Sequence, residues 1–150
     1  MSRMDARGPA SQIAENDRRW WALATIALGT ALVIMDATIV NVALPVVIRD
    51  LDLTANQAEW MNAIYSLVFA ALLLTVGHLG DVRGRRVLFA AGMVVFMLAS
   101  VAAGAAAGPW LLICARFAQG VGASAMLTSA LSSMNAIFRG RERGIAFAVY

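Results

Sequence analysis

The sequence predicts an all-α protein that crosses a lipid bilayer several times, and three observations support this fold class. Hydrophobic residues make up 61% of the chain and charged residues only 14%, far from the composition of a soluble globular domain. The mean hydropathy is +0.73. The apolar residues gather in four long runs, at about residues 21–48, 60–79, 87–107 and 110–134.

Each run is long enough to cross the membrane as a helix. A helix rises about 1.5 Å per residue, so about 20 residues span a hydrocarbon core of about 30 Å. The bilayer core offers no hydrogen-bond partner to a bare peptide group, so each run must be helical. We expect residues 1–20 to form a tail and residues 21–150 a partial transmembrane domain, with a truncated fifth helix from about residue 144.

The first run, residues 21–48, follows a tail that carries four arginines. No small-residue cleavage site follows a short apolar stretch, so we interpret the run as an uncleaved membrane anchor rather than a signal peptide. All four tryptophans lie at the ends of predicted spans, where the membrane interface favours aromatic side chains. They are Trp20, Trp21, Trp60 and Trp110.

The arginines that flank the runs predict the orientation, because the chain contains no lysine. Ten of the 12 arginines lie in the tail, between the second and third runs, or after the fourth run. Only Arg49 lies in a connection on the opposite side, and Arg116 lies inside the fourth run. The positive-inside rule therefore predicts a multi-pass protein of the plasma (inner) membrane with a cytoplasmic N-terminal tail. The connections at residues 49–59 and 104–109 then face outward.

Two charged side chains lie within the predicted spans, Asp36 in the first and Arg116 in the fourth. A charged group near the bilayer centre costs roughly 2.5 to 3.5 kcal/mol on insertion scales, so each requires a physical reason. Helical rise places Asp36 about 16 to 18 Å and Arg116 about 9 to 10 Å below the outer surface, so the two could meet. A buried ion pair that only fixes helix packing is the alternative to an ion or substrate path.

Polar and small side chains accompany both charges. One stripe of the first run is too polar for lipid and could line a water-filled cavity; it includes Thr38, Asn41 and Pro45. Arg116 shares a stripe with Gln119 and Gly120. We therefore expect both charged groups to face the interior of the helix bundle.

Several other function classes are disfavoured. The arginines divide among membrane-flanking sites and form no aromatic-interleaved patch, which argues against nucleic-acid binding. Cys114 and His78 are each the single residue of their type, so neither a disulfide nor a metal site is expected. The chain has no HExxH or GxSxG pattern, and we do not expect an enzyme.

Three motifs resemble those of the major facilitator superfamily of secondary transporters. GHLGDVRGRR, residues 77–86, is similar to the loop signature between helices two and three. It matches at Gly77, Leu79, Asp81, Gly84, Arg85 and Arg86. It departs from the signature at Val82, where a basic residue is usual.

The other two motifs lie in the first and fourth runs. LLICARFAQGVGA, residues 111–123, resembles the fourth-helix signature of proton antiporters. It matches at Leu112, Arg116, Gln119, Gly120, Gly122 and Ala123. MDATIVNVALP, residues 35–45, resembles the first-helix signature of the fourteen-helix drug:proton antiporter branch. On this resemblance the chain holds the first four transmembrane helices, and the start of a fifth, of a superfamily N-terminal half.

The resemblance implies roles for the motif residues. The loop aspartate, Asp81, would engage a helix of the other half and latch the cytoplasmic side shut, helped by ion pairs of Arg85 and Arg86. The glycines Gly77, Gly80 and Gly84 would permit a tight turn and close backbone approach. Asp36 and Arg116 would take part in proton coupling. The remaining motif residues would line the cavity or pack helices: Thr38, Asn41, Pro45, Gln119, Gly120 and Gly122.

The expected function is therefore proton-coupled export of drugs or other small amphipathic compounds by alternating access. The resemblance implies no cofactor, because the proton gradient supplies the energy. The expected partners are a hydrophobic or amphipathic small molecule, the lipid bilayer and the transporter helices that this chain lacks. The 150 residues alone are expected to be inactive. The alternative is a non-transporting membrane scaffold or a truncated remnant.

Overall fold

The structure, a computed structural model, describes residues 9–137 together with residues 144 and 148. Four helices make up the described part: α1 (Pro9–Asp50), α2 (Ala55–Arg83), α3 (Arg85–Gly104) and α4 (Pro109–Ile137). All four are long and apolar enough to cross a membrane, so the predicted all-α membrane fold is confirmed. The predicted start of a fifth helix near residue 144 lies almost entirely outside the described residues.

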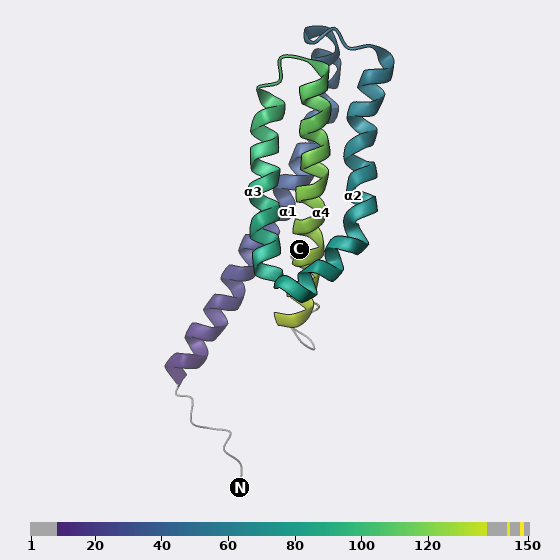
Figure 1. The fold of residues 1–150 in the computed structure, drawn as a ribbon. Coiled ribbons are helices and arrows are strands. Elements are labelled where there is room, and N and C mark those ends of the chain that lie inside the picture. The colour runs from purple at the N-terminus through teal and green to yellow at the C-terminus, as the bar shows by residue number, and fades with distance from the viewer. Residues whose placement is uncertain (1–8, 138–143, 145–147, 149–150) are drawn as a thin grey trace.

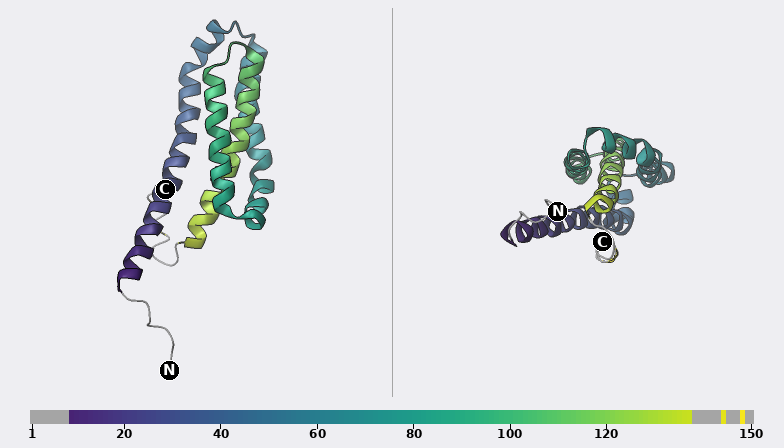
Figure 2. Two further views of the ribbon diagram at one scale, coloured as in Figure 1. Left: turned by 60° about the vertical axis from the view of Figure 1, so that its left-hand side comes forward. Right: turned by 90° about the horizontal axis from the view of Figure 1, so that it is seen from below.

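The helices lie side by side, with α4 between α2 and α3 (Figure 1). α4 packs most closely against α3 and α2, and α1 packs mainly against α4. The N-terminal turns of α1 project past the end of the other three helices (Figures 1 and 2). α4 is therefore the central element, and a side chain on it can meet residues from every other helix.

Local sequence signals set the helix boundaries. Thr54 begins α2 with a capping box, in which its hydroxyl accepts from the Gln57 backbone N–H while the Gln57 side chain accepts from the Thr54 backbone N–H. α4 begins at Pro109, where the missing N–H of proline costs no helical hydrogen bond. α3 ends at Gly104, although the apolar run continues to about residue 107, because glycine has low helix propensity.

Small residues allow α3 and α4 to approach closely. A Cβ atom added to Gly92 would lie 2.8 Å from the Gly122 carbonyl oxygen, and one added to Gly122 would lie 2.7 Å from the Gly92 carbonyl oxygen. Real Cβ atoms essentially never come this close, so the two backbones touch directly. The contact continues into a buried apolar cluster that includes Phe89, Phe96 and Met126.

Candidate functional site

A buried ion pair joins α1 to α4. Nη1 of Arg116 donates to Oδ2 of Asp36 at 2.8 Å. The Arg116 side chain is 3% exposed and the Asp36 side chain 16%. Each charge therefore has the opposite charge as its neighbour inside the bundle, which offsets the desolvation that either would suffer alone.

Gln119 completes the coordination of the carboxylate. Its Nε2 donates to Oδ1 of Asp36 at 2.7 Å and to the Ser100 hydroxyl at 2.9 Å. Its Oε1 accepts from Nη1 of Arg116 at 2.9 Å. The three-residue spacing of Arg116 and Gln119 brings both to the same face of α4. Both oxygens of Asp36 are thus held by donors from α4.

Tyr65 brings α2 into the site, so that all four helices contribute to it. The guanidinium of Arg116 lies over its ring, 4.4 Å from the centroid, which favours the cation electrostatically. The Tyr65 ring is in turn stacked on Phe69 with centroids 6.2 Å apart. The cluster therefore takes Asp36 from α1, Tyr65 from α2, Ser100 from α3, and Arg116 and Gln119 from α4.

Two open cavities reach the ion pair from different sides. A polar cavity of about 500 Å³ lies between α1 and α2 and is lined by Arg116. An apolar groove of about 310 Å³ lies between α1 and α3 and is lined by Asp36 and Ser100. The ion pair therefore borders both spaces, the polar cavity through Arg116 and the apolar groove through Asp36.

Of the three first-helix motif residues, one lines the polar cavity. Asn41 is exposed and lines the polar cavity. The Thr38 hydroxyl donates to the Ile34 carbonyl oxygen at 3.0 Å, so it is satisfied within its own helix. Pro45 is exposed within α1, and its carbonyl oxygen accepts from Nε of Arg49 at 3.3 Å.

Two motif glycines on α4 allow close helix packing. A Cβ atom on Gly120 would lie 2.9 Å from the Tyr65 carbonyl oxygen, so Gly120 brings α2 against α4 at the site. Gly122 makes the corresponding contact with α3. The α4 motif therefore places its small residues where two neighbouring helices approach Arg116.

The sequence GHLGDVRGRR forms a nearly continuous helical junction rather than the loop expected from the resemblance. Gly77 and Gly80 lie inside α2, which runs to Arg83, and α3 begins at Arg85. Only Gly84 is non-helical, with φ of 94°, a conformation that other residues rarely adopt. One glycine is enough to reverse the chain because the last turns of α2 bend toward α3 (Figure 1).

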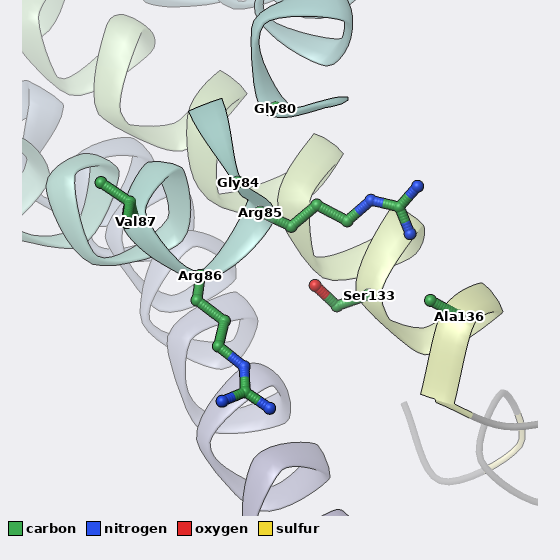
Figure 3. Close-up of a pocket in the computed structure, with 7 residues that line it drawn as sticks. All are labelled: Gly80, Gly84, Arg85, Arg86, Val87, Ser133 and Ala136. Atoms are coloured by element: carbon green, nitrogen blue, oxygen red, sulfur yellow. The ribbon is translucent and has the colours of Figure 1, made fainter. Parts of the chain in front are cut away.

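The junction forms a basic cavity of about 490 Å³ together with the last turns of α4. Nη1 of Arg85 donates to the Ser132 carbonyl oxygen at 2.7 Å, which ties α3 to α4. Figure 3 shows the Arg85 side chain extending beside α4 and the Arg86 side chain pointing away from it. The side chain of Asp81 lies outside the described part of the structure, so its predicted role as a latch stays a prediction.

Three residues of the site were not found by sequence reasoning. Ser100 is a single hydroxyl in an apolar run, and its position opposite Gln119 could not be read from periodicity. Tyr65 is an ordinary aromatic residue of an apolar run, and nothing in the sequence indicates its contact with the guanidinium. Glu59 was placed in an outward connection, but it lies on α2 and lines the polar cavity. Within the described residues, no group of acidic, histidine and cysteine side chains could hold a metal ion.

Comparison with known proteins identifies the family. The model of the Major Facilitator Superfamily matches residues 26–150. The chain belongs to this superfamily. It is thus a multi-pass membrane protein of a transporter family and not an enzyme.

Several curated relatives of this superfamily member are named as drug efflux or resistance proteins. The chain is 46% identical to the puromycin resistance protein pur8 of Streptomyces alboniger over 89% of its own length and 27% of that protein. It is 37% identical to the multidrug efflux pump LfrA of Mycolicibacterium smegmatis over 95% of its length and 29% of the pump. A probable actinorhodin transporter of Streptomyces coelicolor is 38% identical over 89% of this chain and 23% of that protein. The chain therefore spans about a quarter of the length of these relatives.

Proposed function

We propose that this chain is the N-terminal part of a full transporter that exports amphipathic small molecules in exchange for protons. Membership of the superfamily supports transport, and the names of the relatives support drugs or antibiotics as the substrate class. The transport path would lie between this segment and helices of the second half, with alternating access from rocking of one half against the other.

The observation that carries the proposal is the ion pair of Asp36 and Arg116, which links α1 to α4 inside the bundle. A pair that served packing alone would need no open polar cavity beside it, yet Arg116 lines one of about 500 Å³. Ionisable groups within the membrane that face a cavity commonly mark ion or substrate paths.

The proton step would occur at the Asp36 carboxylate. A proton that reaches the carboxylate through the cavity neutralises it and removes its attraction for the Arg116 guanidinium. The rocking motion then exposes the neutral acid to the other side, where the guanidinium returns, the proton leaves to water and the ion pair re-forms. One proton crosses the membrane in each such cycle, and no covalent bond to the substrate is made.

The basic junction would serve as the cytoplasmic gate in this cycle. The excess of arginine at the junction and in the tail supports a cytoplasmic position for both. Gly84 lets α3 follow α2 after one non-helical residue, and Arg85 holds the junction to α4. Asp81 would engage a helix end of the second half, where a carboxylate gains about 0.3 to 1 kcal/mol at a helix N-terminus.

The test is gradient-driven transport by the full-length protein that contains this segment, reconstituted in liposomes. An imposed pH gradient should drive accumulation of a drug such as puromycin, and a protonophore that collapses the gradient should abolish it. The 150-residue chain in the same liposomes should be inactive, because it lacks the opposing half. A full-length protein that inserts but never transports would favour the scaffold alternative.

A further inference from the structure

Ser100 is the polar residue that α3 contributes to the buried cluster. After Arg86, every other side chain of α3 is apolar or glycine. Hydroxyls in membrane helices commonly donate to a backbone carbonyl one turn earlier, as those of Thr38 and Thr128 do here. The Ser100 oxygen instead accepts from another helix, from Nε2 of Gln119 at 2.9 Å. Ser100 therefore acts on the cluster and not only on its own helix.

The amide of Gln119 is fully engaged in this arrangement, and the residue is only 1% exposed. Its Nε2 donates to Oδ1 of Asp36 and to Ser100, while its Oε1 accepts from Nη1 of Arg116. The two ends of an amide have nearly the same shape, so the partners decide which way round it lies. Turned by half a rotation, its oxygen would face the carboxylate and its NH₂ group the guanidinium, and both contacts would be repulsive.

The Asp36 carboxylate receives hydrogen bonds only from donors on α4 in the part of the chain that the structure describes. Nη1 of Arg116 reaches one oxygen and Nε2 of Gln119 the other. Donors stabilise the ionised form of a carboxyl group, whereas a protonated acid needs an acceptor for its own proton. The orientation of the Gln119 amide therefore bears directly on the proton equilibrium of Asp36.

The charged and titratable groups around the ion pair come from α2 and α4. They are Tyr65 and Glu59 of α2 and Arg116 itself. The other charged side chains of α1 lie near its two ends, and α3 contributes only the uncharged Ser100 to the cluster. Ser100 can thus influence the proton equilibrium only through the hydrogen bond that it accepts.

We propose that Ser100 is a positioning residue for the proton step: its oxygen holds the Gln119 amide with Nε2 toward Asp36 and so favours the ionised carboxylate. The proposal rests on the function proposed above, in which Asp36 carries the proton. Without the Ser100 hydroxyl, one buried N–H of Gln119 loses its acceptor, which is unfavourable. The amide is then held less firmly in the orientation that stabilises the carboxylate, and Asp36 should take up its proton at higher pH.

A purely structural role for Ser100 predicts a different result. The hydrogen bond would then only join α3 to α4, which already touch backbone to backbone at Gly92 and Gly122. Its loss would lower the Tm and leave the proton equilibrium of Asp36 unchanged. The pH at which Asp36 is half protonated therefore separates the two roles.

The experiment measures the protonation of Asp36 in the full-length protein reconstituted in lipid, by infrared difference spectroscopy over a series of pH values. A protonated carboxylic acid has a C=O stretch apart from the bands of amides and carboxylates, and the band that Asp36→Asn lacks belongs to Asp36. In Ser100→Ala the midpoint pH of this band should rise by about 0.5 unit or more. Ser100→Thr keeps the hydroxyl, and the apolar groove that Ser100 lines can take the added methyl group, so its midpoint should stay within about 0.2 unit of the wild type.

Ser124→Ala is the matched control. Ser124 is buried, and its hydroxyl donates to the Val121 carbonyl oxygen of its own helix at 2.8 Å. Its removal should leave the midpoint unchanged. Where Ser100→Ala does not fold, Ser100→Cys replaces it, because a thiol has a similar size but is a weak acceptor, and the midpoint should rise in the same direction.

Each outcome decides the proposal. A higher midpoint in Ser100→Ala that Ser100→Thr does not share supports it. An unchanged or lower midpoint, an equal rise in Ser100→Thr or Ser124→Ala, or a wild type without an Asp36 band overturns it. Transport is measured separately, so the failures are distinguishable. Proton-driven export with an unshifted midpoint removes the role of Ser100 alone, and a shifted midpoint without export removes the transport proposal alone.

Discussion

The guanidinium of Arg116 lies 2.8 Å from the carboxylate of Asp36, across 80 positions of sequence and between two helices that otherwise touch little. Removing one member of such a buried pair typically costs about 3 to 5 kcal/mol, because the other charge is left uncompensated. The pair therefore holds α1 against α4 while the Asp36 carboxylate is ionised. Protonation of the carboxylate would remove this attraction. This dependence on a proton is what a coupled transporter requires.

Arg116→Lys tests whether guanidinium geometry matters beyond charge. Nη1 of Arg116 serves Asp36 and Gln119 together while the group lies over the Tyr65 ring. Lysine keeps the charge but presents a compact ammonium on a flexible stem. Gradient-driven transport by the full-length variant in liposomes should fall at least about tenfold with normal membrane insertion. Wild-type transport by this variant would show that a point charge is enough.

Gly92→Ala tests the backbone contact between α3 and α4. The new Cβ would lie 2.8 Å from both the Gly122 carbonyl oxygen and the Ala125 Cβ atom, so the helices must separate. Overpacking of this kind costs typically about 1 to 3 kcal/mol and should lower the Tm of the detergent-solubilised protein. Gly104→Ala is the control, because its Cβ would meet nothing within 4 Å and the Tm should stay equal or rise.

Gly84→Ala tests the junction between α2 and α3. Nothing lies within 4 Å of the new Cβ, so the effect would come from the backbone conformation alone, with φ of 94°. An L side chain in such a conformation costs about 1 to 2 kcal/mol. The expected result is a lower Tm and slower transport, again measured against Gly104→Ala. An unchanged Tm and transport rate would mean that the junction tolerates another backbone geometry.

Hydropathy was enough to predict the four spans, because a bilayer makes every long apolar run a helix. The cost of a charge in lipid likewise singled out Asp36 and Arg116, and helical spacing placed Gln119 beside Arg116. The structure brings these three together. Their roles in proton coupling stay predictions.

Other features of the site depend on contacts between helices. The sequence pattern of a single helix carries no information about such contacts. A hydroxyl such as Ser100 is ordinary in a membrane helix, since it can bond its own backbone, and only the position of Gln119 shows its use. Glu59 stands near a helix start, where acidic residues are common, so its position in the sequence does not indicate that it lines a cavity. The glycines of the junction suggested a loop, but Gly77 and Gly80 lie within α2 and only Gly84 interrupts the helices.

The most direct test of the account is the Asp36→Asn variant of the full-length protein in liposomes. Asparagine preserves the size of the side chain and hydrogen bonding to Gln119 but cannot carry a proton. Drug accumulation driven by a pH gradient should fall to background, while exchange of drug across the membrane without a gradient should continue, and Asp36→Glu should retain some coupling. Gradient-driven accumulation at the wild-type rate in Asp36→Asn would contradict the account.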